Sequence, residues 1–384
     1  MLQAVLSTFP MFVCLFWFIT IIMDKKKVTK ARKLLAVFMF ASFLVFFSHA
    51  YYFNRGTALF NVVESLYSLS SLLVYPLFFL YIAELTGTRI TPARQLLAVL
   101  PSCLLFIIIF VVFFLMSPLE QSAYKQFIIE GRKISQLSGM AGLQAVIFRL
   151  SRLIYILQIV PIVLISKKNI ERYQNELENF YSFTEDRSLW WAKNMLYVMM
   201  LTSVMSAVFS LIGRAAFGTS LWILLIPSMI FTILLYMVGY VGYHQRFTAR
   251  DFENDIRKTE KITVKQTNDD YNLKDRLVHL MNRDMIYTRE DLRITDVASL
   301  LGSNRTYVSQ VVNQDFGISF SQFINSYRIT YAKKLLIDPA SKHLSIKGIG
   351  EMAGFSNEAS FFRVFKKETG QSPAVWRSSV MQSR

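Results

Sequence analysis

The chain has 384 residues, enough for two or three domains. Its hydrophobic fraction of 53% is high and its apolar residues are clustered, which excludes a wholly soluble organisation and indicates membrane spans. The net charge is +16, but both halves are basic, so charge alone does not establish nucleic-acid binding. Both cysteines, Cys14 and Cys103, lie in apolar stretches, which argues against a disulfide framework.

The N-terminal half contains apolar stretches that each come near the ~20 residues needed to cross a bilayer as a helix. No basic region precedes the first stretch, so we expect it to be a retained span rather than a secretory signal. We predict seven spans, at residues 2–23, 34–53, 62–83, 96–116, 141–165, 194–213 and 221–243.

The basic residues between these spans predict the orientation of the chain. With the N-terminus outside, the inner loops hold 13 Lys and Arg residues and the outer loops hold 5. Cytoplasmic loops carry an excess of Lys and Arg. The odd number of spans and the charge bias therefore both predict that the C-terminal domain lies in the cytoplasm.

Two arginines fall inside the fifth predicted span. Arg149 and Arg152 are costly in a bilayer unless they pair, face a wet cavity or extend toward the interface. One alternative is that the span starts later and both side chains reach the outer interface. The other is an intramembrane ligand or ion-pair site, with Glu64 or His49 as the partner.

No pattern in the chain is typical of catalysis. There is no Gly-rich phosphate-binding loop, no paired carboxylates in a plausible cleft and no Cys/His cluster with metal-ligand spacing. We expect no enzyme activity, no catalytic residue, no metal and no cofactor. The longest outer loop, residues 117–140, is too short for a separate sensor domain, so an effector would bind there at a shallow site or within the bundle.

Residues 244–270 are polar and charged, which predicts a cytoplasmic linker that begins as a helical extension. Apolar spacing resumes at Leu273, Leu277 and Leu280, where a globular domain begins. The sequence thus predicts an all-α protein with a seven-helix transmembrane domain at 1–243, a linker at 244–270 and a cytoplasmic helical domain at 271–384.

This last domain contains an internal repeat. Residues 294–317 and 346–370 each show a short apolar helix, a turn glycine (Gly302 or Gly354), an Asn and a second helix with apolar spacing. Each copy has the pattern of a helix-turn-helix, and we call them the first and second HTH modules. Residues 320–336 between them predict one long helix that holds the two second helices at a fixed separation.

The second helix of each module should expose polar and basic side chains. Such groups hydrogen-bond base edges or phosphates in a major groove, and two helices ~34 Å apart enter successive grooves. The predicted DNA-binding residues are Arg305, Thr306, Tyr307, Gln310 and Asn313 in the first module, and Asn357, Glu358, Ser360, Arg363, Lys366 and Lys367 in the second.

Residues 273–377 resemble the AraC/XylS-type DNA-binding domain. The resemblance rests on the first module and on three further stretches, Phe320-x-x-Phe323-Ile324-Asn325-x-Tyr327-Arg328-Ile329-x-x-Ala332-x-x-Leu335-Leu336, Gly354-Phe355-Ser356-Asn357 with Phe361-Phe362-Arg363-Val364-Phe365-Lys366-Lys367, and Gly370-x-Ser372-Pro373-x-x-x-Arg377. It implies an all-helical domain with two recognition helices joined by a linker helix, and a role as a transcription factor.

Two positions depart from that family, which usually has an acidic residue and then Ala where this chain has Gly348 and Gly350. Glycine inside a helix costs about 1 kcal/mol relative to alanine. We therefore expect a looser second module. The family's usual soluble sensor domain is absent, so its effectors do not carry over.

These observations predict a membrane-anchored, sequence-specific transcription regulator in the bacterial inner membrane, coupling a signal to gene expression. Its expected partners are double-stranded DNA, the lipid bilayer, an unidentified effector, a second copy of the chain and RNA polymerase. One alternative is a transporter or receptor whose helical tail binds proteins. Another is proteolytic release of the tail from the linker.

Overall fold

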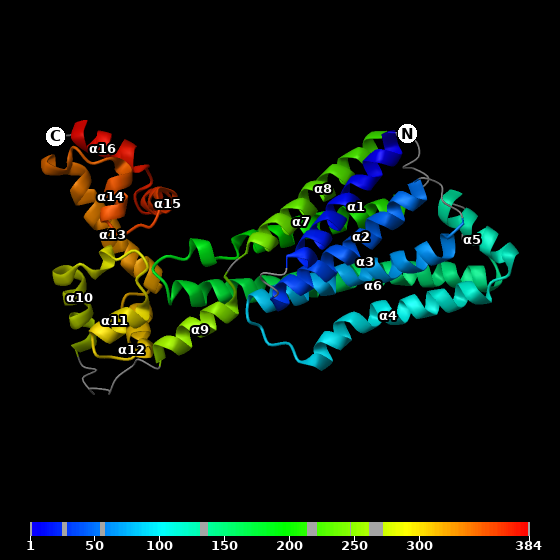
Figure 1. Ribbon diagram of the computed structural model, residues 1–384, viewed down its shortest axis with the longest axis horizontal. Helices are drawn as coiled ribbons and strands as arrows, with labels where there is room; N and C mark the ends of the chain where they lie inside the picture. The colour runs from blue at the N-terminus through cyan, green and yellow to red at the C-terminus, as the bar shows by residue number, and fades with distance from the viewer. Residues whose placement is uncertain are drawn as a thin grey trace. The chain divides into compact units, whose positions relative to one another are not determined.

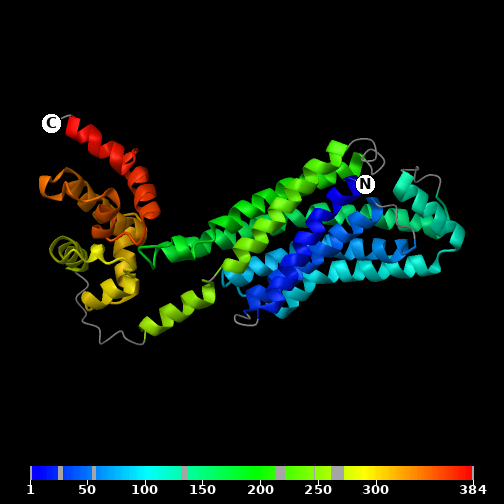
Figure 2. The same ribbon diagram turned by 45° about the horizontal axis from the view of Figure 1, so that its top comes forward.

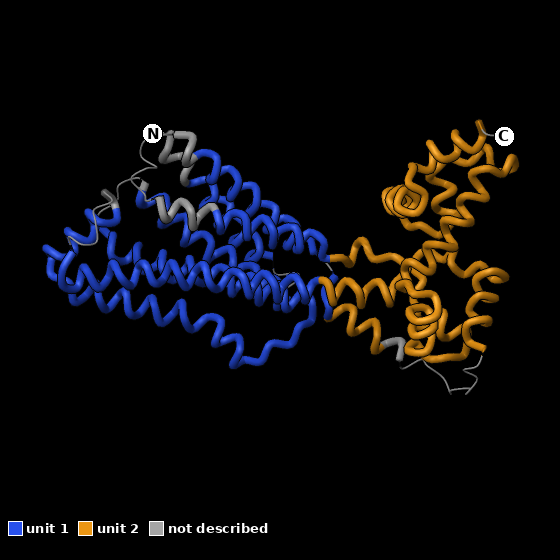
Figure 3. Tube along the Cα trace, turned by 180° about the vertical axis from the view of Figure 1, so that it is seen from behind, with its two compact units in different colours: residues 1–170, 189–249 blue, residues 171–188, 250–384 orange. Residues whose placement is uncertain are grey.

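The computed structural model describes residues 2–24, 29–53, 58–130, 137–212, 221–245, 247–260 and 272–382. These residues form helices, and the ladder pairing found among them is one isolated bridge between Tyr181 and Arg293, so the predicted all-α class is confirmed. The chain divides into two compact units, coloured separately in Figure 3. Unit 1 comprises residues 1–170 and 189–249, and unit 2 comprises residues 171–188 and 250–384.

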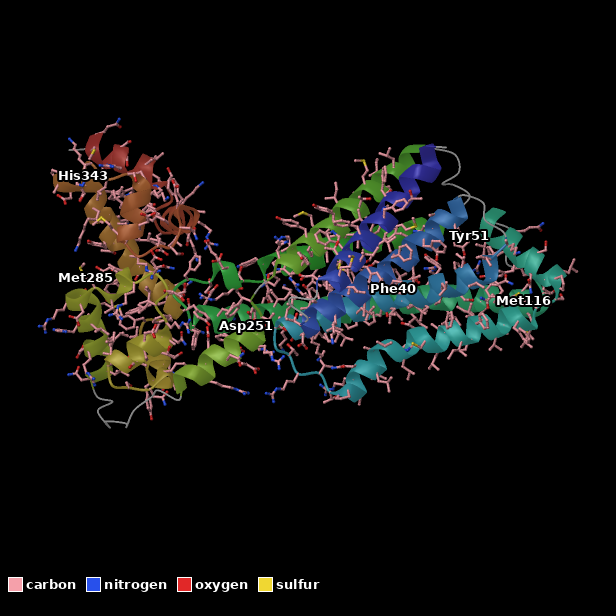
Figure 4. The ribbon with its side chains drawn as sticks, in the orientation of Figure 1. Phe40, Tyr51, Met116, Asp251, Met285 and His343 are labelled. Atoms are coloured by element: carbon pink, nitrogen blue, oxygen red, sulfur yellow. The ribbon has the colours of Figure 1, made fainter. Side chains whose placement is uncertain are left out.

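Unit 1 is a bundle of long helices. Helix α1 packs against α2 and α8, α2 also packs against α3, and α3 packs against α4 (Figures 1 and 2). Tyr51 near the end of α2 and Met116 just after α4 are labelled in Figure 4. The helices are α1 (Leu2–Met23), α2 (Lys30–Phe53), α3 (Phe60–Leu85), α4 (Pro92–Leu115), α5 (Pro118–Glu130), α6 (Gly139–Glu178), α7 (Trp190–Ile212) and α8 (Leu221–His244).

A helix lies at each of the seven predicted spans. Among the described residues, five segments are long and apolar enough to cross a membrane, and α1 adds a shorter apolar stretch, Thr8–Met23. The number of seven spans remains a prediction. The five segments are Lys30–Tyr52, Phe60–Leu85, Pro92–Leu115, Gly139–Glu178 and Leu225–Arg257.

The outer surface of unit 1 is rich in large apolar side chains. Phe114 of α4 is 84% exposed and Leu157 of α6 is 63% exposed, and many neighbours on both helices are similar. Contiguous apolar surface of this kind is unusual on a soluble monomer and suits contact with lipid chains.

Two glycines let α8 approach its neighbours closely. A Cβ atom on Gly239 would collide with the indole of Trp17 on α1. A Cβ on Gly242 would lie 2.8 Å from both Leu35 Cδ2 of α2 and the Tyr81 hydroxyl of α3. Small residues at helix contacts are a common means of close packing in membranes.

The structure differs from the sequence analysis at two places in this bundle. The predicted outer loop 117–140 contains α5, which begins with a capping box in which Glu120 accepts from the Ser117 N–H at 2.9 Å. Helix α6 was predicted to end near residue 165 but continues to Glu178. At 1.5 Å per residue its 40 residues span about 60 Å, roughly twice the hydrocarbon thickness.

Unit 2 contains the end of α6, the connection to α7 and the C-terminal helices. Asp251, labelled in Figure 4, lies in α9, which falls within the predicted linker, while residues 261–270 of that linker lie outside the described residues. Met285, also labelled there, ends α10 with a φ of 45°. The elements are the short turn η3 (Glu185–Arg187), α9 (Ala249–Glu260), α10 (Leu273–Asp284), α11 (Ile294–Leu300), α12 (Arg305–Gln310), the π-helical turn η7 (Val311–Asp315), α13 (Phe320–Ile337), α14 (Ile346–Met352), α15 (Glu358–Thr369) and α16 (Pro373–Gln382).

The close contact at Gly239 makes a prediction about the bundle. We expect Gly239→Val to lower the thermal unfolding temperature of the detergent-solubilised chain, because the added side chain displaces Trp17 from α8. The matched control is Met237→Val, which introduces the same side chain at a position of α8 that is 39% exposed. Equal unfolding temperatures for the two variants would contradict this packing role.

Candidate DNA-recognition helices

The first HTH module is built from α11 and α12. Helix α11 ends where the Gly302 N–H donates to Ser299 O and the Ser303 N–H donates to Ala298 O at 2.9 Å. Gly302 takes a φ of 57°, a conformation that glycine adopts without strain. Asn304 then caps α12 by accepting from the Thr306 N–H at 2.9 Å.

The second module repeats these bonds. The Gly354 N–H donates to Glu351 O and the Phe355 N–H donates to Gly350 O at 3.0 Å. Asn357 caps α15 by accepting from the Ser360 N–H at 2.8 Å. The internal repeat found in the sequence therefore extends to the individual hydrogen bonds that end one helix and begin the next.

Helix α13 joins the modules and carries a buried cation, Arg328, which is 1% exposed. Its guanidinium donates to backbone carbonyl oxygens of Tyr287 at 2.7 Å, Arg289 at 2.6 Å and Glu290 at 3.2 Å. Burial lowers the pKa of Arg328 to about 10, so it remains charged at neutral pH. These carbonyls belong to the connection before α11, so Arg328 fixes that connection against α13.

In the first module, the structure exposes most of the predicted DNA-binding side chains. Thr306, Tyr307, Gln310 and Asn313 are exposed, and Arg305 is half-buried. The buried Val308 and Val312 hold the opposite face of the helix in the domain core.

In the second module, one predicted residue is wrong. Ser360 is only 3% exposed, because its place in the first turn of α15 points it into the domain, so it is not an outward contact. Asn357 is half-buried and its side-chain oxygen is engaged as the helix cap. The remaining predicted contacts are exposed, and they are Glu358, Arg363, Lys366 and Lys367.

Gly350 has a packing role that sequence reasoning missed. A Cβ atom there would lie 2.8 Å from Phe361 Cδ1 and 2.9 Å from Cγ, so its absence lets Phe361 of α15 lie directly on α14. Phe361 is fully buried in a cluster with Ile349 and Phe365. Gly348 differs, because a Cβ there would meet Ser345 Oγ at an ordinary 3.4 Å.

Sequence reasoning also missed the residues of unit 2 that face the recognition helices. They come from the connection between α6 and α7 and from α9. The guanidinium of Arg305 lies 5.7 Å from the ring centroid of Phe180, and Arg363 forms an ion pair with Glu185. No motif signals these contacts, because the partners lie far apart in the sequence.

The candidate intramembrane residues are only partly brought together. Arg152 and His49 line a cavity of about 100 Å³ in unit 1, and the Arg152 guanidinium lies 4.6 Å from the ring centroid of Tyr67. Arg149 is exposed, and the buried Glu64 does not line this cavity. No group of His, Cys, Asp and Glu residues with metal-binding geometry occurs in the part of the chain that the structure describes.

The helix-turn-helix domain family matches residues 297–379. These residues form a helix-turn-helix domain of the AraC type. The match covers both recognition helices and α13 but not unit 1, and no solved structure matches the chain.

Known relatives resemble the chain over the same region. The HTH-type transcriptional regulator YtdP of Bacillus subtilis is 29% identical over 34% of this chain and 17% of its own length. YfiF of the same organism is 37% identical over 25% of this chain and 29% of its own length. A Staphylococcus aureus regulator, SAS0078, is 32% identical over 24% of this chain and 12% of its own length. The chain thus spans less than a third of each relative, and the names of these relatives describe transcriptional regulators, not enzymes.

The two glycines of α14 make opposite predictions. We expect Gly348→Ala to raise the free energy of unfolding of unit 2 by up to about 1 kcal/mol, because alanine favours the helix. We expect Gly350→Ala to lower it by about 1–2 kcal/mol, because displacing Phe361 outweighs that gain. Denaturant unfolding of the full chain followed by Trp376 fluorescence, with other tryptophans replaced by Phe, would measure both. Stabilisation by both substitutions would contradict the packing role of Gly350.

Proposed function

We propose that the chain is a membrane-anchored, sequence-specific DNA-binding transcriptional regulator of the bacterial inner membrane, with its C-terminal domain in the cytoplasm. The observation that carries the proposal is the repeated HTH geometry, in which α12 and α15 each follow the same capped turn. The family match and the names of the relatives support it.

Basic groups on both recognition helices support DNA as the partner. Arg363, Lys366 and Lys367 project from α15, and Arg305 begins α12. Arginine and lysine contribute phosphate contacts, and arginine also pairs with guanine edges. Helix α13 keeps the two helices at a fixed separation, as reading two successive major grooves requires.

Unit 2 is made of two stretches that are separate in the sequence, and this supports the proposed topology. Residues 171–188 and 250–384 pack together and therefore lie on one side of the membrane. The chain between them contains α7 and α8, so these two helices cross as a pair. The basic bias of the inner loops then favours the cytoplasm for both parts of unit 2.

The effector site of this proposal is the cavity lined by Arg152 and His49. Its lining is mainly apolar and aromatic, and Arg152 supplies a cation beside Tyr67. A half-buried arginine in an apolar cavity favours a small ligand with an anionic group.

Substitution of the two arginines tests DNA binding. We expect Arg305→Ala and Arg363→Ala each to weaken the binding of the full chain to duplex DNA about fivefold or more, because each removes a contact worth roughly 1–3 kcal/mol. The slope of the logarithm of the binding constant against the logarithm of the salt concentration should also become shallower by about one for each lost phosphate contact. Fluorescence anisotropy would measure both effects.

The matched control is Arg283→Ala, which removes an exposed arginine of α10 outside both recognition helices. Unchanged affinity in all three variants, with DNA bound, would instead favour a protein-interaction role for the helical domain.

Cysteine labelling tests the topology. In a chain with Cys14 and Cys103 replaced by alanine, we expect Ser122→Cys in the outer loop to react with an impermeant maleimide in intact cells. Ser188→Cys should react only after the cells are opened, because it belongs to unit 2. Labelling of both positions in intact cells would contradict a cytoplasmic unit 2.

A further inference from the structure

The arginines at the two recognition helices contact one segment of the chain, the connection between α6 and α7. We call residues 179–188 the docking segment. Phe180 lies under the guanidinium of Arg305 at 5.7 Å, and Glu185 pairs with Arg363. An arginine of each recognition helix therefore contacts an aromatic ring or a carboxylate from the same ten residues.

Backbone pairing fixes the docking segment to the domain. The Ser182 N–H donates to Leu292 O at 3.0 Å, and the Ile294 N–H donates to Phe180 O at 2.9 Å. The Ser182 carbonyl also accepts from Ser321 Oγ at 3.0 Å. These bonds attach the segment at the start of α11, beside the first recognition helix.

Helix α9 reinforces this attachment through Asp255. The Tyr181 hydroxyl donates to Asp255 Oδ2 at 2.6 Å, and burial together with this carboxylate raises the pKa of Tyr181, so the hydroxyl stays a donor. Arg293 pairs with the same carboxylate at 3.4 Å, and Arg187 pairs with Asp291 at 3.0 Å. The docking segment is thus bound through Tyr181 to a carboxylate of α9 and through Arg187 to a carboxylate just before α11.

The exposed face of α12 opens into a cleft whose far wall comes from the docking segment and its flanking helices. The cleft has a volume of about 640 Å³. A volume of this size suits a small molecule rather than a DNA duplex. One wall includes Arg305, Thr306, Gln310 and Asn313, and the other consists of Glu176, Asn179, Phe180, Phe252 and Ile256.

We propose that the docking segment and α9 form an autoinhibitory clamp that excludes DNA from the recognition helices until the segment undocks. The inference rests on the proposed DNA-binding function. Its physical basis is competition, because the Glu185 carboxylate pairs with Arg363 and would repel a DNA phosphate, while Phe180 and α9 form the wall opposite the exposed face of α12. The apparent DNA affinity is then reduced by the fraction of chains that are undocked.

When the docking segment leaves, the buried guanidinium of Arg328 still keeps hydrogen-bond acceptors within the domain. Ser182 Oγ accepts from Arg328 at 3.2 Å, but three backbone carbonyls of the domain also accept from this guanidinium. The segment follows α6, which begins in unit 1. Movement of α6 caused by an effector would therefore reach the segment directly through the chain.

The test compares the DNA affinities of full-length variants in lipid nanodiscs. The probe is a fluorescent duplex of mixed sequence, long enough for two adjacent major grooves, at low salt where phosphate contacts support binding without a known operator. We expect Glu185→Gln to raise the affinity about two- to fivefold, the size of effect expected for losing a partly exposed ion pair.

Asp186→Asn is the matched control, because it removes the same charge from the exposed neighbour of Glu185. An equal gain in both variants, or no gain in either while the wild type binds the duplex, would overturn the clamp and leave the proposed function intact. Failure of the wild type and both variants to bind the duplex would overturn the proposed function, and the clamp with it.

Hydrogen exchange gives a second measurement in the wild-type chain. Saturating duplex should speed exchange of the Ser182 and Ile294 amides, since their bonds hold the docked segment. Unchanged protection of both amides with duplex bound would also overturn the clamp, because DNA and segment would then bind together.

Discussion

The backbone pairing of residues 180–182 with residues 292–294 is the interaction on which the organisation of unit 2 depends. It joins the connection between α6 and α7 to the residues that begin the first HTH module. Through this pairing, the segment between α6 and α7 becomes part of the unit that carries the recognition helices.

A second connection, between α10 and α11, stabilises the buried charge of Arg328. Arg328 is buried without a carboxylate within ion-pair distance among the described residues, so its charge is stabilised by carbonyl oxygens that converge from residues 287–290. A buried charge needs several fixed hydrogen bonds, and fixing these carbonyls also fixes the start of α11. The Arg328 guanidinium therefore links the packing of α13 to the position of the first recognition helix.

Much of the fold was predictable because it follows from local patterns. Apolar stretches predicted helices at all seven ranges, and the turn glycines with Ser-Asn shortly after them predicted where the second helix of each module begins. Only the structure identifies Asn304 and Asn357 as the capping residues. The helix α5 also had a local signal, the Ser117–Glu120 capping box, which went unused. The exposure of Ser360 was predicted wrongly, because helical spacing alone does not say how deeply the first turn of α15 sits in the core.

The sequence by itself determined the helices, the repeated modules and the identity of the basic side chains on α12 and α15. These features depend on the spacing of apolar residues and on helix caps, and both act between residues only a few positions apart in the sequence. Only the tertiary structure decided that Gly350 provides room for Phe361 and that Glu185 pairs with Arg363. Those contacts join residues distant along the chain, and their partners are selected by the packing of whole helices, which no local pattern encodes.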